Sequence, residues 1–272
     1  MAFIDAHNHL QDERLSSGLD TILAECERIG VRRAVVNGTH PRDWPRVAAL
    51  AERCAWILPS FGVHPWYSND IPTDYLSILE GYLNRSRSVI GEIGIDHWMK
   101  GIDRQRQEEV FLAQLAVARE RNLPVTIHGL KAWGRLLELL RAHGVPQKGF
   151  LLHSYSGPRE LVGAFAELGG YFSVAPAFFA TQRGRKLEVF RHIPVDRILP
   201  ETDAPDQGPS IEADLYRGVK NLGLAVNHPG NIQIVYAGLG HLLGRSNDDI
   251  NERLRDNFTR LFGPDGGESN FS

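Results

Sequence analysis

The 272-residue sequence is poor in cysteine and lysine and has no long apolar run. Only Cys26 and Cys54 are present, so at most one disulfide can form, and disulfide scaffolds and cysteine-rich zinc modules are excluded. No window approaches the roughly 18 consecutive apolar residues that a membrane-spanning helix needs. The N-terminal segment MAFIDAHNHL also lacks the basic stretch and apolar run of a signal peptide. We therefore expect a cytoplasmic protein that has no membrane partner.

The sequence also lacks an excess of positive charge. Its 30 basic residues face 33 acidic ones, which gives a formal net charge of −3. Domains that bind nucleic acid through a general positive field are strongly basic, and this chain is not. Any polyanion must therefore be bound by a local feature of the surface.

What the sequence does contain is an alternation of apolar, β-branched segments with helical patterns. Eight candidate strands begin at Phe3, Arg32, Trp56, Ser88, Pro124, Gly149, Gly170 and Arg197. Between them, apolar residues recur at helical spacing. The strand starts are 21 to 36 residues apart, which is the length of one βα unit. Eight such units predict an α/β fold of the TIM type, a (β/α)8 barrel, rather than an open sheet.

No linker rich in proline, glycine and serine divides the chain, so we expect a single domain. After the eighth strand, a helical pattern begins near Asn231, and a last helix begins at Ser246, with Asp249 three residues later as in a capping box. We expect the barrel to span residues 1–263 and residues 264–272 to form a disordered tail.

Ionisable residues stand at the ends of the predicted strands. They are His7, His9, His64, Glu92, His128, His153 and Asp203. Barrel enzymes place their active site at the C-terminal ends of the strands, so these side chains are expected at one mouth. His7 and His9 are two residues apart, so within a strand they project to the same face.

A single histidine at a strand end is more often a hydrogen-bonded core or loop residue than a metal ligand. The joint placement of such residues at one end of several strands is much less easily explained by chance. Five imidazoles and two carboxylates at one mouth would carry heavy desolvation and like-charge costs unless metal ions offset them. The pattern therefore predicts a metal site.

The same residues lie in motifs that resemble the TatD family of metal-dependent hydrolases. The ordered set comprises FIDAHNHL, GVHPW, GEIGIDHW, PVTIHGLKA, LLHSYSG and PETDAP, followed by NHPGN and RDNFTRLFG. This resemblance implies a barrel of the amidohydrolase kind and two divalent metal ions, for which Mg, Mn and Zn stay open. By motif, His7, His9, Glu92 and Asp203 would hold one ion, and Glu92, His128 and His153 the second, with Glu92 bridging.

The resemblance also implies phosphodiester hydrolysis, in the manner of a deoxyribonuclease that acts from a 3′ end with a metal-activated water. We expect Asp203 and Glu92 to be catalytic, with Asp203 accepting the proton of the water and Glu201 as the alternative base. His64, which precedes Pro65, would hydrogen-bond a phosphate oxygen or else be a structural residue where the chain turns. The expected substrate is nucleic acid, single-stranded DNA above all. Trp66, Trp98 and Phe178 would stack on a base, or else pack in the core or rim.

The sequence departs from the family pattern after strand five, where the usual His-Ser-Arg is replaced by His128, Gly129 and Leu130. Lys131 follows, and it would supply the missing positive charge for the substrate without the fork of an arginine, or else begin the helix that runs through Trp133 to Leu140 and face solvent. Two other functions stay open. One is hydrolysis of an ester or amide such as an aminoacyl-tRNA, and the other is a partner-controlled barrel subunit without catalysis.

Overall fold

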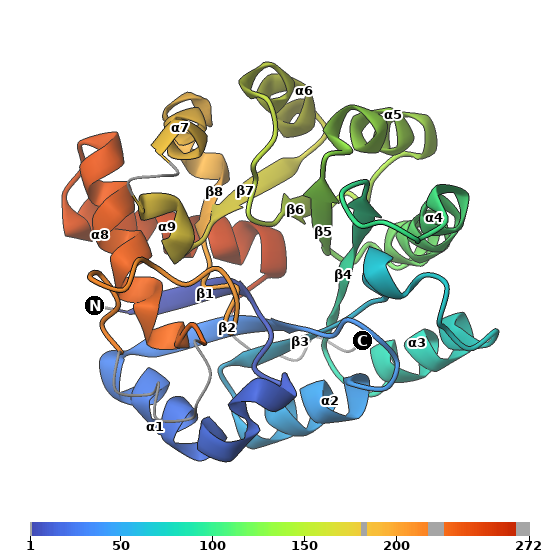
Figure 1. The fold of residues 1–272 in the computed structure, drawn as a ribbon, viewed down its shortest axis with the longest axis horizontal. Helices are drawn as coiled ribbons and strands as arrows, with labels where there is room; N and C mark the ends of the chain where they lie inside the picture. The colour runs from blue at the N-terminus through green and yellow to red at the C-terminus, as the bar shows by residue number, and fades with distance from the viewer. Residues whose placement is uncertain (1, 181–183, 217–225, 265–272) are drawn as a thin grey trace.

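The computed structural model describes residues 2–180, 184–216 and 226–264, and all eight predicted strands are present (Figure 1). The strands are β1 (Phe3–Asn8), β2 (Val31–Asn37), β3 (Ile57–Phe61), β4 (Val89–Asp96), β5 (Val125–Leu130), β6 (Phe150–Leu152), β7 (Gly170–Val174) and β8 (Ile198–Pro200). They form one sheet in sequence order, and each strand pairs in parallel with the next. The expected single-domain (β/α)8 barrel is confirmed.

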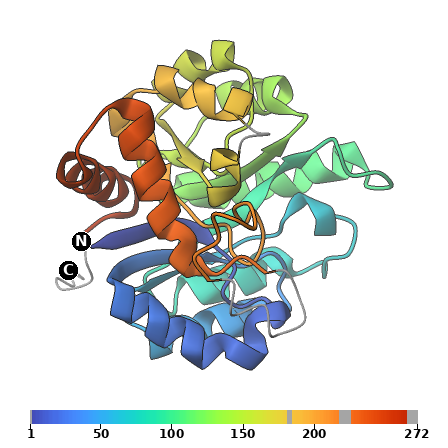
Figure 2. The ribbon, with the colours of Figure 1, turned by 60° about the vertical axis from the view of Figure 1, so that its left-hand side comes forward.

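The helices lie around the outside of the strands, as Figures 1 and 2 show. The α-helices are α1 (Leu19–Ile29), α2 (Trp44–Arg53), α3 (Tyr75–Leu83), α4 (Arg104–Glu120), α5 (Trp133–His143), α6 (Val162–Glu167), α7 (Gly184–Leu187), α8 (Ile232–Leu243) and α9 (Asn247–Phe262). Short 3₁₀ helices include η1 (Glu13–Gly18), η2 (Pro65–Tyr67), η3 (Arg159–Leu161), η4 (Pro176–Phe179), η6 (Glu188–His192), η7 (Val195–Arg197) and η9 (Pro229–Asn231). In the described part of the chain, no helix is long and apolar enough to cross a bilayer.

The strands read as nearly continuous apolar runs because both of their faces are covered. Every residue of β1, β3, β4, β6, β7 and β8 is buried. The barrel interior packs against one face and the helices against the other, which is the usual environment of parallel strands. A charged residue inside such a strand, such as Glu92 in β4, therefore needs a specific partner.

The ends of β1 and β8 are joined by polar contacts. The backbone N–H of Asp203 donates to the carbonyl of His7 at 2.9 Å. Deeper in the barrel, the buried carboxylate of Asp5 accepts hydrogen bonds from Thr202, from its backbone N–H at 2.9 Å and its hydroxyl at 2.5 Å. These bonds hold the first and last strands side by side at the end where the candidate ligands lie.

The C-terminal helices also follow the sequence signals. The hydroxyl of Ser246 accepts the backbone N–H of Asp249 at 3.2 Å and caps α9, and α8 begins at Ile232. Except for Pro264, the predicted tail lies outside the described residues. Both α8 and α9 thus lie where the sequence signals placed them.

Candidate metal centre and active site

The seven side chains selected from the sequence converge at the C-terminal ends of the strands. A cavity of about 890 Å³ opens there, and it is lined by His9, His64, Glu92, His128, His153 and Asp203. His7 is fully buried and approaches the same group from inside the barrel. The structure therefore brings together every metal ligand that the sequence suggested.

Glu92 lies at the centre of the group and is 2% exposed. Its Oε2 atom lies 3.5 Å from His7 Nε2 and 3.3 Å from His9 Nε2. Its Oε1 atom faces the other side, 3.1 Å from His128 Nδ1 and 2.8 Å from His153 Nε2. The two oxygens of one carboxylate thus separate the four imidazoles into two pairs.

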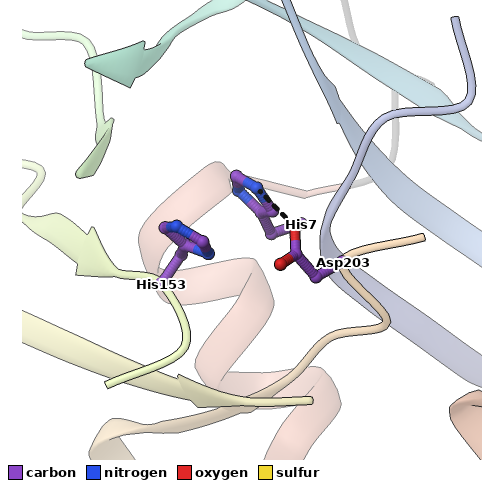
Figure 3. A group of neighbouring side chains, drawn as sticks. All are labelled: His7, His153 and Asp203. Atoms are coloured by element: carbon purple, nitrogen blue, oxygen red, sulfur yellow. Dashed lines mark ion pairs between the residues drawn. The ribbon is translucent and has the colours of Figure 1, made fainter. Parts of the chain in front are cut away.

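Asp203 joins the pair on the Oε2 side. Its Oδ1 atom lies 3.3 Å from His7 Nε2 and 3.5 Å from His9 Nε2. Figure 3 shows this ion pair, with His153 beside His7. The His7 and His153 rings stack, with centroids 4.1 Å apart and planes 14° from parallel. The two pairs of ligands are therefore adjacent parts of one site.

The spacing of the nitrogens fits divalent cations. His7 Nε2 and His9 Nε2 are 3.1 Å apart, and so are His128 Nδ1 and His153 Nε2. Two imidazoles that bind the same ion at about 2.0–2.1 Å place their coordinating nitrogens about 3 Å apart. Lone pairs that converge in this way repel unless a proton or a cation lies between them. The donor set therefore suits a metal ion on either side of Glu92.

The outward nitrogen of each ring shows which role the ring can take. His9 Nδ1 lies 2.7 Å from the carbonyl oxygen of Asn37, so Nδ1 carries the proton and Nε2 keeps a lone pair for a metal. His64 is the opposite case, because its Nδ1 accepts the backbone N–H of Trp66 at 3.2 Å. In neutral His64 the proton is therefore on Nε2, which lies 3.4 Å from Glu92 Oε1. His64 can donate a hydrogen bond into the site but offers it no lone pair.

Two buried carboxylates lie behind the other imidazoles, an arrangement that the sequence analysis missed. Asp96 Oδ2 lies within hydrogen-bond distance of His128 Nε2, at 3.2 Å, whereas Glu201 Oε1 lies 3.7 Å from His153 Nδ1, which is too far for a hydrogen bond. Each carboxylate faces the nitrogen opposite the one that points to Glu92. For Asp96 a signal was present, since it follows Glu92 by four residues in one strand and so shares its face.

Glu201 is held away from the cavity. Its Oε1 accepts the backbone N–H of Ser154 at 2.8 Å and the hydroxyl of Ser154 at 2.5 Å, and its Oε2 accepts the hydroxyl of Ser173. Glu201 is fully buried and does not line the cavity. With its oxygens bound to serine donors and no place in the cavity wall, Glu201 is poorly placed to exchange protons with a water in the cavity.

Gly94 allows β4 to approach β5 beside the metal centre. Its φ is +153°, and a Cβ built there would lie 2.1 Å from the carbonyl oxygen of His128. Gly94 and His128 are register partners in the two strands. A side chain at this position would push His128 away from Glu92.

Neighbouring groups in the site oppose the effect of burial on the pKa values of Glu92 and His9. Burial raises the pKa of Glu92, but the surrounding imidazoles, His153 above all, outweigh it and hold this pKa well below the ordinary 4.5. Burial lowers the pKa of His9, but Asp203 and Glu92 raise it well above 6.5. Protons therefore compete with a metal ion for these nitrogens, so metal affinity falls at low pH.

His64 differs from the other imidazoles in charge as well as in tautomer. Burial lowers the pKa of His64 to about 4, and the nearby carboxylate of Glu92 only partly opposes this. His64 is therefore neutral near pH 7. It can donate one hydrogen bond to an oxygen of a substrate without adding charge to the site.

Lys131 is not brought to the cavity. It is exposed, with a φ of +53°, in the turn between β5 and α5. Gly129 and Leu130 line the cavity, and Lys131 does not. The cavity-lining lysine of the described residues is the exposed Lys186 of α7.

The three aromatic residues considered for stacking fall into two groups. Trp66 and Trp98 line the cavity and are 41% and 54% exposed. Phe178 also reaches the cavity wall, but it is 2% exposed and packs edge-on against Phe190 with ring centroids 6.1 Å apart. The two tryptophans offer open ring surface, whereas Phe178 belongs to the core.

Comparison with known proteins agrees with this geometry. The family described as TatD related DNase matches residues 4–263. The chain is 28% identical to YcfH of Escherichia coli, named as an uncharacterized metal-dependent hydrolase, over 96% of both chains. It is 27% identical to deoxyribonuclease TATDN3 of Homo sapiens, over 96% of this chain and 95% of the relative.

A solved structure shows the same fold. The crystal structure of YjjV, a TatD homologue from Escherichia coli, superposes with a TM-score of 0.87 at 27% identity and covers 96% of this chain and 98% of its own. The family match spans nearly the whole barrel, including every residue of the centre around Glu92. The chain therefore belongs to the TatD-related DNase family and is a metal-dependent hydrolase of that family.

Proposed function

We propose that this protein is a phosphodiesterase that uses two divalent ions, and that it acts as a deoxyribonuclease of the 3′ exonuclease type on single-stranded DNA. The observation that supports this most is the division of the imidazoles by the two oxygens of Glu92. In this proposal His7, His9, Glu92 and Asp203 hold one ion, and Glu92, His128 and His153 hold the other. The cytoplasmic location stays a prediction.

The choice of metal follows from the donors. The proposed set contains four imidazoles and two carboxylates, and such nitrogen-rich sites suit Zn²⁺ better than Mg²⁺, which prefers oxygen donors and water. When bound, the two ions supply the Lewis acidity that makes a water nucleophilic near neutral pH and that stabilises charge at phosphorus. We therefore propose Zn²⁺ or Mn²⁺ as the better activators.

Asp203 is the proposed base. It lines the cavity, and its Oδ1 lies within 3.5 Å of both His7 Nε2 and His9 Nε2. These partners lower the pKa of Asp203 although burial raises it, so the carboxylate is ionised and can orient a water and accept its proton. The alternative base, Glu201, is occupied by serine donors and lies outside the cavity lining.

His64 is the proposed donor to the phosphate. Its Nε2–H points toward the site because its Nδ1 is an acceptor for Trp66 N–H. A neutral donor at this position can stabilise a phosphate oxygen as negative charge grows on it. Lys131, proposed from the sequence as a second anion contact, stays a proposal that mutation must test, since it lies outside the cavity lining.

The exposed tryptophan rings at the mouth of the cavity favour single-stranded DNA as the substrate. Trp66 and Trp98 expose ring surface beside the cavity, and base stacking on such rings does not depend on sequence. The arginines that line the cavity are already paired with carboxylates, in the pairs Arg14–Asp206, Arg42–Asp70 and Arg46–Glu13. The attraction for a phosphate therefore comes mainly from the metal centre.

The test is a comparison of substrates with each metal. Metal-free protein is reloaded with Mg²⁺, Mn²⁺ or Zn²⁺ and given single-stranded DNA labelled at the 5′ end or at the 3′ end. We expect stepwise release of 3′ nucleotides, faster on single strands than on duplex. Hydrolysis of aminoacyl-tRNA or of a simple ester with no cleavage of DNA would instead identify the ester or amide hydrolase.

A further inference from the structure

The network behind His128 extends to the rim of the cavity through Asp96. This carboxylate is the last residue of β4 and is 1% exposed. Its Oδ2 accepts the indole N–H of Trp66 at 2.6 Å and faces His128 Nε2 at 3.2 Å. One oxygen atom therefore contacts both a candidate metal ligand and the half-exposed ring at the mouth.

The other contacts of Asp96 fix its position. Its Oδ1 accepts the backbone N–H groups of Trp98 at 2.7 Å and Met99 at 3.1 Å. The amide of Gln107 binds its main chain in both directions, accepting from the Asp96 N–H at 3.0 Å and donating to the Asp96 carbonyl at 3.1 Å. A buried carboxylate with this many donors has a single orientation.

This orientation determines what His128 presents to the metal centre. A carboxylate is an acceptor, so the proton of neutral His128 lies on Nε2 and the lone pair lies on Nδ1. Nδ1 is the atom that lies 3.1 Å from Glu92 Oε1 and 3.1 Å from His153 Nε2. Loss of the carboxylate would free His128 to take the other tautomer, which points a proton at the ion.

Trp66 connects the same network to His64. Its indole N–H binds Asp96, while its backbone N–H binds His64 Nδ1 at 3.2 Å. A shift of Trp66 would thus disturb two imidazoles that both face Glu92 Oε1. The aromatic rim and the Oε1 side of the centre are parts of one hydrogen-bonded unit.

We propose that Asp96 is a positioning residue that sets His128 for metal binding and Trp66 for substrate stacking at the same time. The proposal rests on the function proposed above, in which His128 holds the second ion and a nucleotide base stacks on the rim. It assigns to Asp96 no contact with the substrate and no proton transfer. Its effect passes through the tautomer of one ring and the orientation of another.

The first experiment measures metal binding without catalysis. Metal-free parent, Asp96→Asn and the control Asp256→Asn are titrated with Zn²⁺ or Mn²⁺ by calorimetry. Asp256 is exposed on α9, away from the cavity lining. Orienting carboxylates of this kind are worth about 10- to 100-fold in metal affinity. We expect that loss for one of two ions in Asp96→Asn and none in Asp256→Asn.

The second experiment tests the rim. Trp66→Phe keeps an aromatic ring but removes the indole donor, and we expect KM for a single-stranded oligonucleotide to rise about five- to tenfold with little change in kcat. Trp56→Phe is the matched control, since the Trp56 indole donates to the carboxylate of Glu27 at 3.0 Å far from the cavity. A KM in Trp66→Phe equal to that of the parent would overturn the link to the rim.

The outcomes separate this inference from the proposed function. A parent protein that binds fewer than two ions would defeat the two-ion function itself. A parent that binds two ions, together with a folded Asp96→Asn that binds both equally well, would defeat only the role of Asp96. If Asp96→Asn does not fold, Trp66→Phe tests the role of Asp96 instead, because this variant leaves the carboxylate in place.

Discussion

His153 Nε2 lies 2.8 Å from Glu92 Oε1, which is the shortest contact between Glu92 and the imidazoles around it. Because this contact lies on one side of the carboxylate, replacing His153 should affect one ion and spare the other. We expect His153→Ala to bind one divalent ion per chain where the parent binds two, as measured by elemental analysis after dialysis. His143→Ala, at an exposed position at the end of α5, is the control and should retain both ions. Loss of both ions together would show that the two halves of the centre do not bind independently.

Replacing Asp203 separates its basicity from its shape. Asp203→Asn keeps an oxygen that can face His7 and His9, but an amide does not accept a proton from water. We expect an intact fold and a fall in kcat of at least about 10²-fold, the usual cost of losing a general base. Circular dichroism checks the fold and steady-state kinetics the turnover. Turnover close to that of the parent would assign the base to another group.

The strand order and the candidate metal ligands could be predicted because they depend on patterns along the chain. Both faces of the strands are buried, so their apolar runs stand out, and the polar residues that interrupt or end them mark the mouth. Spacing placed His7 and His9 on one face of a strand, and the family resemblance grouped them with Asp203. The structure confirms that these residues meet.

The supporting contacts could not be predicted because they depend on how loops fold. The tautomer of His64 is set by a backbone N–H in η2, and the pairing of His153 with Glu201 crosses between the ends of two strands. Lys131 lies outside the cavity lining in a turn where its φ is +53°. None of these features has a periodic signal in the sequence.

The tautomer of His64 leads to a prediction about substrate binding. His64→Ala removes a donor but no metal lone pair, so metal content should equal that of the parent while kcat/KM falls about 10- to 100-fold. His64→Gln offers an amide donor and should recover part of the loss. Parallel metal analysis and kinetics on one DNA substrate provide the measurement. A loss of bound metal in His64→Ala would instead make His64 a ligand.

His228, outside the metal centre, predicts how stability depends on pH. It is 2% exposed and stacks on Tyr216 with ring centroids 4.1 Å apart, and burial lowers its pKa to about 4 from an ordinary 6.5. The unfolded chain therefore takes up this proton first as pH falls. The contribution of His228 to the free energy of unfolding is fully present above pH 6.5, and up to about 3 kcal/mol of it is lost as pH falls toward 4.

His228→Asn tests this contribution. Asparagine can accept the Gly230 N–H that His228 Nδ1 accepts at 2.9 Å, so the cap of η9 is kept while the titrating ring is removed. We expect urea unfolding of the variant to depend less steeply on pH between 6.5 and 4 than that of the parent. Parallel curves for the two proteins would show that His228 does not contribute.

The departure of this chain after strand five gives the last prediction. Leu130 lines the cavity, so Leu130→Arg places a guanidinium fork where a phosphate can meet it. We expect a lower KM for single-stranded DNA and a steeper dependence of KM on salt, because ions screen the added charge pairing.

Lys131→Ala raises KM and flattens the salt dependence if the ammonium of Lys131 binds the substrate. The same KM and salt dependence as the parent would exclude that contact, and an increase of KM in Lys186→Ala would then assign the anion contact to the lysine that lines the cavity. If Leu130→Arg leaves KM for DNA unaltered as well, the mouth does not hold a phosphate beside β5, and hydrolysis of an ester or amide becomes the better description of the reaction.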